Sequence, residues 1–222
     1  MGLGWVSRPR IIERKPRGDA PYRLRHAGKD DTDALTSVVA KAFQDDPVAI
    51  WLLPDPEIRK KVKYGYVRML AEYALDAGTV DLITARDTEK LVAAALWWDA
   101  DLAFSDYDER LREVVPADVR PRFLELNEIA QSHESELPSG LPRVYLAFLA
   151  VLPKLQRNNL GTTLLNHRHG ILDAARKQAF LHASSTASRR LYLRHRYADR
   201  PGSFTLPNGP KMFPMLRLPV AG

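Results

Sequence analysis

The chain has 222 residues, 45% of them hydrophobic, and this length and composition fit a single globular domain with its own core. It contains no cysteine, which excludes disulfides, thiolate metal sites and a cysteine nucleophile. No apolar run approaches the roughly 18 to 20 residues that a membrane-spanning helix needs, and the N-terminus lacks the apolar segment of a signal peptide. We therefore expect a cytoplasmic protein without membrane association.

The formal charge of +6 is unevenly distributed along the chain. Residues 143–222 carry 13 Lys or Arg and only two acids, Asp173 and Asp199, whereas residues 1–142 have a net negative charge. A basic C-terminal third suits an anionic ligand such as a nucleotide, a phosphopantetheine donor or RNA. A solvated helix face enriched in arginine would give the same composition, so charge alone does not select the ligand.

The N-terminal part predicts a leader, a strand and a helix. Residues 1–20 are rich in Arg, Pro and Gly without periodicity, so we expect a flexible basic leader before one domain at residues 21–222. The segment YRLRHAG alternates polar and apolar positions, as a first strand does. A helix with one apolar face should then begin near Asp31 or Thr32.

Prolines and glycines delimit the next segments. Three prolines interrupt residues 44–59, which predicts an apolar loop with acidic edges that suits the lining of an amine pocket. An amphipathic helix should follow and end at Gly78. TVDLITARD and KLVAAALWWD then predict a strand pair with a turn at 87–90. Residues 105–138 predict one or two helices broken at prolines.

The C-terminal part alternates strands and helices. RVYLAFLAVLP is a continuous apolar run of strand length, which predicts a central strand buried on both faces. GTTLLNHRHGILDAARKQA predicts a helix, FLHASS a short strand, ASRRLYLRHRY a helix and GPKMFPMLRLP a last strand. The order β-α-α-β-β-α-β-α-β-α-β predicts a mixed α/β sheet domain.

The segment PKLQRNNLGTTLL joins the apolar strand to the next helix. The first N–H groups of a helix lack internal partners and lie at the positive end of its dipole, so such a junction forms an anion site. Gly161 permits close backbone approach, Thr162 and Thr163 add hydroxyl donors, and Arg157 adds charge. A single glycine also occurs in plain connections, so this segment alone leaves the choice open.

Four segments, in order, resemble the GCN5-related N-acetyltransferase (GNAT) superfamily, and most closely the actinobacterial branch that includes puromycin N-acetyltransferase. They are AFQDDPVAIWLLPD, LAFLAVLPKLQRNNLGTTLL, FLHASSTASRRLYLRHRY and LPNGPKMFPMLRLP, and the resemblance covers roughly residues 22–219. It implies one α/β domain with a mixed, mostly antiparallel sheet, a splayed central strand pair and helices on both faces. It also implies that acetyl-CoA or another acyl-CoA donates an acyl group to the amine of a small molecule, such as an antibiotic or a biosynthetic intermediate.

The resemblance also implies a donor site. The backbone of Leu149, Ala150 and Val151 would hold the pantetheine arm, and the Val151 N–H would polarise the thioester carbonyl. Tyr192 would protonate the departing thiolate as general acid. Ser188 takes the place of an asparagine that contacts pantetheine in many members. The amides that would hold the pyrophosphate are those of Gln156, Arg157, Asn158, Asn159, Leu160, Gly161, Thr162 and Thr163.

The loop departs from the family pattern, because QRNNLG stands where QGKGLG is usual. Asn159 tolerates left-handed torsions better than most residues, whereas Arg157 brings a long side chain to a position where backbone usually faces phosphate. His182 replaces an acid, and Arg196 replaces a glycine expected at a helix end. The donor therefore stays open between free acyl-CoA, a carrier protein and an aminoacyl-tRNA, since the basic C-terminal third suits all three.

The acceptor side carries weaker signals. Asp45, Asp46 and Glu72 are candidate proton acceptors because they lie in segments that flank the acceptor in the resembling branch, and Trp51 lies beside two of these acids. Each acid, taken individually, also suits an ordinary surface position. Dimers are common in the superfamily, so a homodimer is compatible with the sequence, although no segment identifies its interface.

The sequence gives little support for a metal site or for a serine hydrolase. His167 and His169 are two residues apart in a predicted helix and point to different faces, so we expect no metal ion. The segment HASSTAS lacks the G-x-S-x-G elbow of a serine hydrolase. Three functions follow: an acyl-CoA-dependent N-acyltransferase, a transferase that uses a carrier protein or aminoacyl-tRNA, and a non-catalytic binding or regulatory protein of the same fold.

Overall fold

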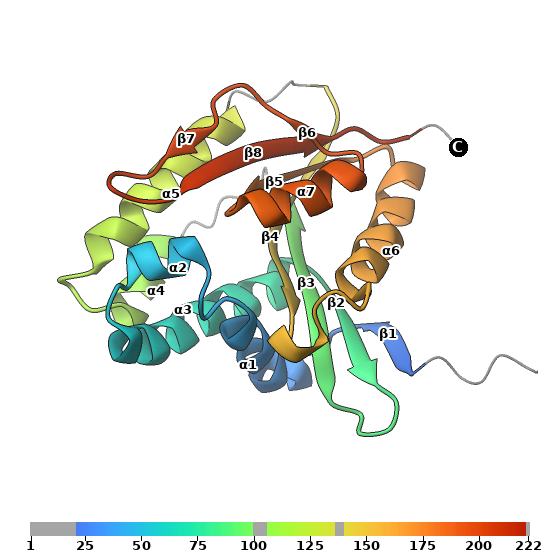
Figure 1. Ribbon diagram of the computed structural model, residues 1–222, viewed down its shortest axis with the longest axis horizontal. Helices are drawn as coiled ribbons and strands as arrows, with labels where there is room; N and C mark the ends of the chain where they lie inside the picture. The colour runs from blue at the N-terminus through green and yellow to red at the C-terminus, as the bar shows by residue number, and fades with distance from the viewer. Residues whose placement is uncertain (1–20, 100–105, 136–139, 221–222) are drawn as a thin grey trace, which may run out of the picture.

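One sheet of eight strands runs through the part of the chain that the computed structural model describes, residues 21–99, 106–135 and 140–220 (Figure 1). The expected leader at residues 1–20 lies outside this part. The strand order is β1-β2-β3-β4-β5-β8-β6, with β7 paired to β8. The strands are β1 (Tyr22–His26), β2 (Gly78–Ala85), β3 (Leu91–Asp99), β4 (Arg143–Val151), β5 (Gln178–Ala183), β6 (Ala198–Asp199), β7 (Phe204–Thr205) and β8 (Lys211–Arg217).

Helices cover both faces of this sheet (Figure 1). They are η1 (Lys29–Asp31), α1 (Thr32–Ala42), α2 (Pro47–Leu52), α3 (Pro56–Ala77), α4 (Tyr107–Val114), α5 (Arg120–Ser135), η2 (Pro153–Leu155), α6 (Leu160–Ala174) and α7 (Thr186–Arg194). The predicted order of strands and helices is confirmed, with α2, β6 and β7 as additions. None of the helices in the described ranges is both long and apolar enough to cross a membrane.

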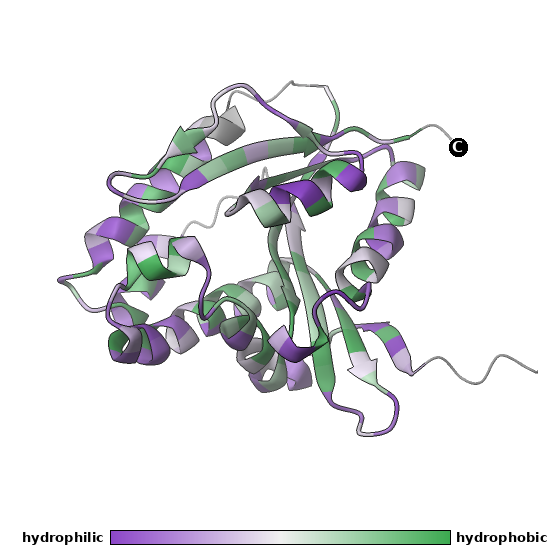
Figure 2. Ribbon diagram, viewed as in Figure 1, coloured by the Kyte–Doolittle hydropathy of each residue, from purple (hydrophilic) through white to green (hydrophobic). Residues whose placement is uncertain are grey.

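The strand β3 is buried on both faces. Ala93, Ala95 and Trp97 pack toward α6, whereas Ala94 and Leu96 pack toward α1 and α3. Figure 2 shows hydrophobic residues along the central strands and hydrophilic residues in the connection between β2 and β3. The sequence predicted two buried faces for β4 instead, and this was wrong, because half-buried and buried residues alternate along most of β4.

The strands β4 and β5 diverge, as the resemblance implied. They form the parallel pair of the sheet, and their pairing is limited to residues 143–145 of β4 and 178–180 of β5. Beyond that point β4 continues against β3 as far as Val151, while β5 continues against β8 as far as Ala183. The remaining strand pairs are antiparallel. The sheet therefore opens between β4 and β5 at their carboxyl ends.

Two prolines that were interpreted as breaks instead start helices. Pro47 is the first residue of α2, and the Asp46 carboxylate before it accepts from Val48 N–H over 2.9 Å. Pro56 starts α3 in the same way after Asp55, which accepts from two backbone N–H groups. Proline lacks a backbone N–H, but at the first helical position this group would have no partner inside the helix. An aspartate before the proline caps the helix. The segment predicted as a loop thus contains a helix that fixes the position of Asp46.

The helix α3 ends at Ala77, as predicted, but Gly78 has a different role from the one expected. Its φ of −129° is ordinary extended backbone rather than a left-handed cap. A Cβ at this position would lie 2.1 Å from the carbonyl oxygen of Trp97 on the neighbouring strand β3. Glycine is required here because α3 passes directly into β2 with no room for a side chain.

Candidate active site

The loop between β4 and α6 keeps a glycine-like backbone without the glycines. Arg157 has a φ of 67° and Asn159 a φ of 60°, so both residues are left-handed at the positions where the family pattern has glycine. This conformation costs a residue other than glycine about 1–2 kcal/mol. The rest of the fold therefore holds the loop in this path.

The loop presents backbone donors at the start of α6. The Thr163 N–H bonds to the Asn159 carbonyl over 2.9 Å, which makes it the first donor with a partner inside the helix. The N–H groups of Leu160, Gly161 and Thr162 precede it and have no intrahelical acceptor. The Thr163 hydroxyl, expected to face an anion, donates to the Asn159 carbonyl over 3.1 Å instead. The backbone rather than this hydroxyl therefore offers the donors.

The edge of β4 that faces the gap is defined by its pairing with β3. The Leu152 N–H donates to the Val92 carbonyl over 3.0 Å. Because the bonding direction alternates along an antiparallel pair, Ala150 also turns its N–H and carbonyl toward β3. Leu149 and Val151 then turn theirs toward the gap. Of the three backbone positions predicted for the pantetheine arm, Ala150 is thus directed away from the gap.

Tyr192 lies in α7 and packs into the core beside α6. Its ring meets the Tyr197 ring edge to face at 5.5 Å between centroids. Burial, with a smaller contribution from the charge of Asp46, raises the pKa of the Tyr192 hydroxyl above its usual value. The hydroxyl therefore stays protonated at neutral pH, and it makes no hydrogen bond to another described residue. Such a group is suited to donating a proton.

Ser188 is committed to the start of α7. Its hydroxyl donates to the Ser185 carbonyl over 3.0 Å and accepts from the Ser185 N–H over 3.2 Å. The Ser185 hydroxyl in turn accepts from the Ser188 N–H over 3.1 Å. These contacts form a reciprocal cap of the helix. The expected contact of Ser188 with the donor thus competes with a cap that already uses its hydroxyl.

A cavity of about 490 Å³ opens beside the gap between β4 and β5. Ala147 of β4 and Ser184, directly after β5, both line it. The rest of its wall is largely apolar and includes the aromatic side chains of Phe43, Tyr66, Trp98, Phe123, Tyr145 and Phe148. This volume lies in the range of small-molecule sites, and the cavity joins the strand gap at its two strand residues.

One carboxylic acid and one lysine line this cavity. Asp46 accepts from the Ser184 hydroxyl over 2.6 Å, and burial raises the pKa of its carboxyl group. Lys63 donates to the Gln44 side chain over 2.5 Å, and burial, helped by the nearby Arg59, lowers its pKa to about 8. An apolar wall with an acid and a poorly solvated lysine favours an organic molecule with polar groups at separate points.

Only one of the four residues predicted for the acceptor side lines the cavity, namely Asp46. Asp45 beside it is exposed. Glu72 pairs with Arg68 and Arg110, each at 3.0 Å. Neither acid belongs to the wall of this cavity, and their expected roles as proton acceptors stay predictions.

Trp51 also lies outside the wall of this cavity. It is buried, and its indole N–H donates to the Pro207 carbonyl over 2.8 Å. An added Cβ on Gly209 would come within 2.4 Å of the same ring. Trp51 therefore fastens α2 to the turn before β8 and does not face the cavity.

Lys63 was missed as a cavity residue, although the sequence held a signal for it. It lies three, four and seven residues before Tyr66, Val67 and Leu70, which share one face of α3 and line the same cavity. A lysine within the apolar stripe of an amphipathic helix is unusual, because a charged group is costly to bury. That position was a signal that Lys63 faces a cavity.

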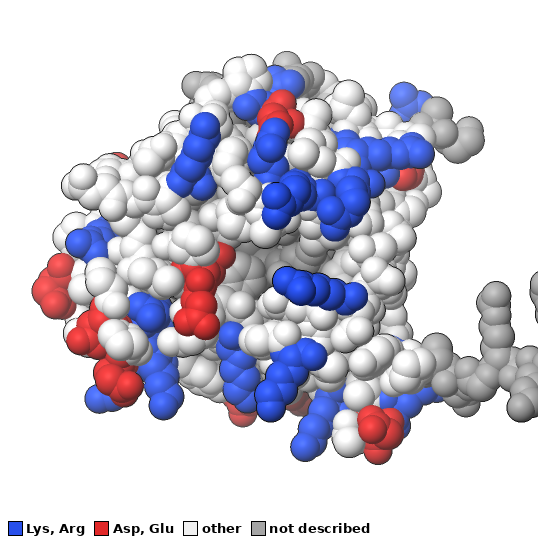
Figure 3. Space-filling view, in the orientation of Figure 1, with Lys and Arg blue, Asp and Glu red and all other residues white. Residues whose placement is uncertain are grey.

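Basic side chains surround the opening. Arg190, Arg194 and Arg196 are exposed on and after α7, and Arg157 is exposed in the donor loop. Figure 3 shows Lys and Arg gathered above a hollow in this face and also below it, with acidic side chains at its left. The charge asymmetry of the sequence is thus concentrated beside the gap, where it favours an anionic ligand.

The two histidines of α6 have different partners, as predicted from their spacing. The His169 ring nitrogen Nε2 lies 3.1 Å from the Tyr197 hydroxyl, and burial lowers the pKa of His169 to about 3. His167 instead faces Asp81 on β2, with 3.7 Å between Nε2 and the carboxylate. The pair therefore does not share an ion.

Solved structures match this arrangement over most of the chain. An HPA2-related histone acetyltransferase structure from Corynebacterium glutamicum has a TM-score of 0.68 at 21% identity and covers 91% of this chain and 99% of its own. The fold is that of the GNAT acetyltransferases. Arylalkylamine N-acetyltransferase 2 from Aedes aegypti has a TM-score of 0.63 at 12% identity, covering 90% and 99% of the two chains.

A PaiA N-acetyltransferase from Thermoplasma acidophilum, solved with coenzyme A, matches more distantly. Its TM-score is 0.53 at 11% identity, with 89% of this chain and 98% of that chain covered. No protein-family model matches the sequence, and no curated protein does. The similarity to GNAT structures thus lies in the fold, at sequence identities too low to carry over a substrate.

Proposed function

We propose that this protein is an acyl-CoA-dependent N-acyltransferase, acetyl-CoA being the leading donor, that acylates the amine of a small molecule with an apolar body. The observation that carries the proposal is that the gap between β4 and β5 meets the cavity with aromatic side chains in its wall. A donor that lies in the gap would direct its acyl group toward the cavity that Ala147 and Ser184 line. Acyl donor and amine would then meet without water between them.

The donor is proposed to use backbone groups. The gap-facing groups of Leu149 and the carbonyl of Val151 pair with the pantetheine amides, and the N–H groups at the start of α6 hold the pyrophosphate. The left-handed torsions of Arg157 and Asn159 keep the loop in a path that usually needs glycine. The PaiA N-acetyltransferase that was solved with coenzyme A has a similar overall fold, which is consistent with this donor.

The proposed reaction is direct transfer. The neutral amine attacks the thioester carbonyl, whose oxygen is polarised by the Val151 N–H, so that a C–N bond forms and the C–S bond breaks. The proton lost by nitrogen passes to the Asp46 carboxylate, directly or through water, and the Tyr192 hydroxyl protonates the leaving thiolate. The raised pKa of each group supports its role, since Asp46 becomes a stronger base and Tyr192 remains a donor.

The cavity restricts the acceptor. Its aromatic wall accommodates a ring or an alkyl chain, and Asp46 lies where an amine would point toward the gap. Lys63 offers a second polar contact, which suits a hydroxyl or carboxyl group at the other end of the acceptor. One structural neighbour is an arylalkylamine N-acetyltransferase, and aromatic amines are therefore the first acceptors to test.

Replacing Tyr192 with Phe tests this proposal. Loss of a general acid typically reduces turnover by about 10²- to 10⁴-fold, so kcat should fall by at least about 10² while the Kd for acetyl-CoA stays nearly constant. Turnover is measured against a panel of arylalkylamines, and donor binding is measured by isothermal titration. Unchanged turnover in the variant would show that Tyr192 does not act as the acid.

Replacement of Tyr197 with Phe is the matched control, because it removes a hydroxyl from the neighbouring ring. That hydroxyl already has a partner, the His169 Nε2 atom at 3.1 Å, whereas the Tyr192 hydroxyl has none among the described residues. We expect the control variant to keep its turnover, apart from a modest loss of stability. If both variants lose turnover equally, repacking of the core accounts for the loss.

A second candidate is a transferase whose donor is a carrier protein or an aminoacyl-tRNA. The basic surface around the gap favours it, since a large anionic donor would contact Arg190, Arg194 and Arg196 outside the gap. Its binding should weaken steeply as salt increases, because counterions are released from the nucleic acid or acidic protein.

Binding of acetyl-CoA with micromolar affinity supports the first candidate, and absence of any acyl-donor binding supports a non-catalytic protein. A branch related to puromycin N-acetyltransferase, a homodimer and a cytoplasmic location stay predictions.

A further inference from the structure

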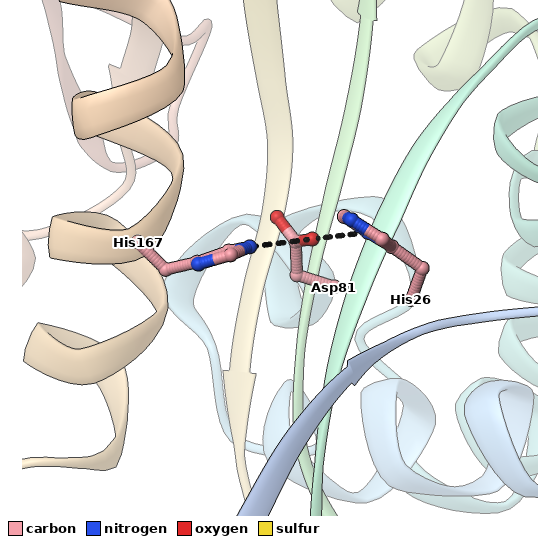
Figure 4. A group of neighbouring side chains, drawn as sticks. All are labelled: His26, Asp81 and His167. Carbon is pink, nitrogen blue, oxygen red and sulfur yellow. Dashed lines mark ion pairs between the residues drawn. The ribbon is translucent and has the colours of Figure 1, made fainter.

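Three side chains that are far apart in the sequence converge at the edge of the sheet away from the cavity. His26 ends β1, Asp81 lies in β2 and His167 lies in α6 (Figure 4). The Asp81 Oδ1 atom is 2.8 Å from His26 Nδ1 and 3.7 Å from His167 Nε2. The three potential ligand atoms all lie within 4.8 Å of one another. Both rings therefore direct a nitrogen toward the same carboxylate oxygen.

The cluster combines a buried acid with accessible imidazoles. The Asp81 side chain is fully buried, whereas the side chains of His26 and His167 are 60% and 34% exposed. The His167 Nε2 atom itself is buried and has no hydrogen-bond partner. At 3.7 Å it is too far from Asp81 for a hydrogen bond. Buried nitrogen atoms without a partner are uncommon and indicate a missing ligand or water.

The carboxylate is held in place from its other side. The buried Arg168 donates through Nε to Oδ2 over 2.8 Å and through Nη2 to Oδ1 over 2.7 Å. An ionised carboxylate offers about four acceptor positions, so this bidentate pair leaves room on Oδ1 for a further contact. Partners of this kind orient metal-binding side chains in many metal sites. Asp81 is thus fixed with one oxygen directed at the two histidines.

We propose that His26, Asp81 and His167 bind one divalent transition-metal ion, with Zn²⁺ as the simplest case. Ligand separations of 2.8 and 3.7 Å suit atoms that each lie about 2.0–2.2 Å from a common ion. Two imidazoles and one carboxylate suit zinc and its neighbours, whereas Mg²⁺ and Ca²⁺ prefer oxygen ligands. Three protein ligands leave a fourth position, and the exposure of His26 allows water to fill it.

The ion would join the first strand to the donor-loop helix. Its ligands come from β1, β2 and α6, and none of the three lines the acceptor cavity. The site therefore stabilises the edge of the sheet and the position of α6 and takes no part in the proposed transfer. Because Arg168 already balances the Asp81 charge, we expect binding weaker than at a thiolate zinc site.

Isothermal titration of the full chain with Zn²⁺, without a histidine tag, tests the site. We expect one ion per chain and a rise in Tm with zinc concentration. His26→Ala and His167→Ala should each weaken binding by more than about tenfold, since even the partners behind metal ligands contribute that much. Both side chains are partly exposed, so these variants should fold, whereas replacing Asp81 would also break its pair with Arg168.

His195→Ala is the matched control, because it removes an imidazole outside the cluster and should leave zinc binding unchanged. Residues 1–20 contain no histidine or cysteine and offer no competing imidazole or thiolate. A second measurement replaces zinc with Co²⁺, whose visible absorption reports the ligand geometry. Absence of stoichiometric binding in the wild type, or zinc binding in either histidine variant as tight as in the wild type, would overturn the proposal.

Discussion

Arg196 closes α7 in a conformation that usually belongs to glycine. Its φ is 66°, the Tyr197 N–H donates to the Tyr192 carbonyl over 3.1 Å, and the Arg196 N–H donates to the Leu193 carbonyl over 3.2 Å. These bonds form a Schellman cap with arginine at the left-handed position. Arginine thus keeps the geometry of a glycine cap at an energetic cost, and it adds charge beside the donor gap.

Replacing Arg196 with Gly should therefore stabilise the protein. A left-handed residue with a Cβ costs about 1–2 kcal/mol, part of which is offset by the greater freedom of glycine in the unfolded chain. We expect the free energy of unfolding, measured in urea, to rise by about 1 kcal/mol. The variant Arg196→Ala removes the same charge but keeps the Cβ and should show no such gain. Equal stabilisation in both variants would assign the effect to charge.

At the scale of elements, the start of α6 contains a glycine that the fold itself does not need. A Cβ on Gly161 would lie 3.6 Å from the nearest atom of Leu149, which is an ordinary contact, and the backbone there is not left-handed. Glycine at this helical position is less favourable than alanine by about 1 kcal/mol. The small residue is explained if a donor approaches the backbone there.

Replacement of Gly161 with Ala should separate folding from donor binding. We expect Tm to stay the same or rise, while the Kd for acetyl-CoA increases by about tenfold, equivalent to about 1.4 kcal/mol. Gly170→Ala in the same helix is the control, because its Cβ would meet nothing within 4 Å. Both variants gain helix propensity, but only the first should lose affinity. An unchanged Kd for Gly161→Ala would place the donor away from the α6 amides.

At the scale of the whole molecule, the buried Lys63 links stability to pH. Its pKa is lowered to about 8 from an ordinary value of 10.5, so the folded protein releases this proton before the unfolded chain does. Between about pH 8 and 10.5 the unfolded state binds more protons, and stability from this group rises with pH in that window. The direction is opposite to that of a lysine held by a salt bridge.

The variant Lys63→Met makes this contribution measurable. From pH 8 to pH 10, the unfolding free energy of the wild type should rise relative to that of Lys63→Met. The comparison isolates Lys63, because the other titrating groups are common to both proteins. Lys60→Met, at an exposed position of the same helix, is the control and should show no such change with pH. A constant difference for Lys63→Met would mean that Lys63 is well solvated in the folded state.

Parts of the site that are continuous in sequence were predictable. The strand, loop and first turn of α6 follow one another along the chain, and the anion-binding potential of such a junction depends only on local backbone geometry. Asn159 was expected to preserve the turn, and it is left-handed. The left-handed torsion of Arg157 was less predictable, because the backbone torsion of an arginine in a loop depends on the two elements that the loop connects.

The acceptor side was largely not predictable. Asp45 and Asp46 are neighbours in sequence, yet only Asp46 lines the cavity. The reason is the unexpected helix α2, which starts at Pro47 and has Asp46 as its cap, so that this acid is directed inward. The hydrogen bond from Ser184 to Asp46 joins residues 138 positions apart. Which acid meets the donor gap is therefore fixed by the packing of α2 against the end of β5.

The sequence by itself determined the α/β order, the resemblance to GNAT proteins and the donor loop, because these depend on periodicity, capping and short contiguous motifs. Tertiary structure alone decided the selection of Asp46, the burial of Lys63 in the cavity and the meeting of His26, Asp81 and His167. The spacing of His167 and His169 gave no reason to expect a metal site. The physical reason is that such clusters join side chains from separate strands and helices, whose distances are set by sheet register and helix packing.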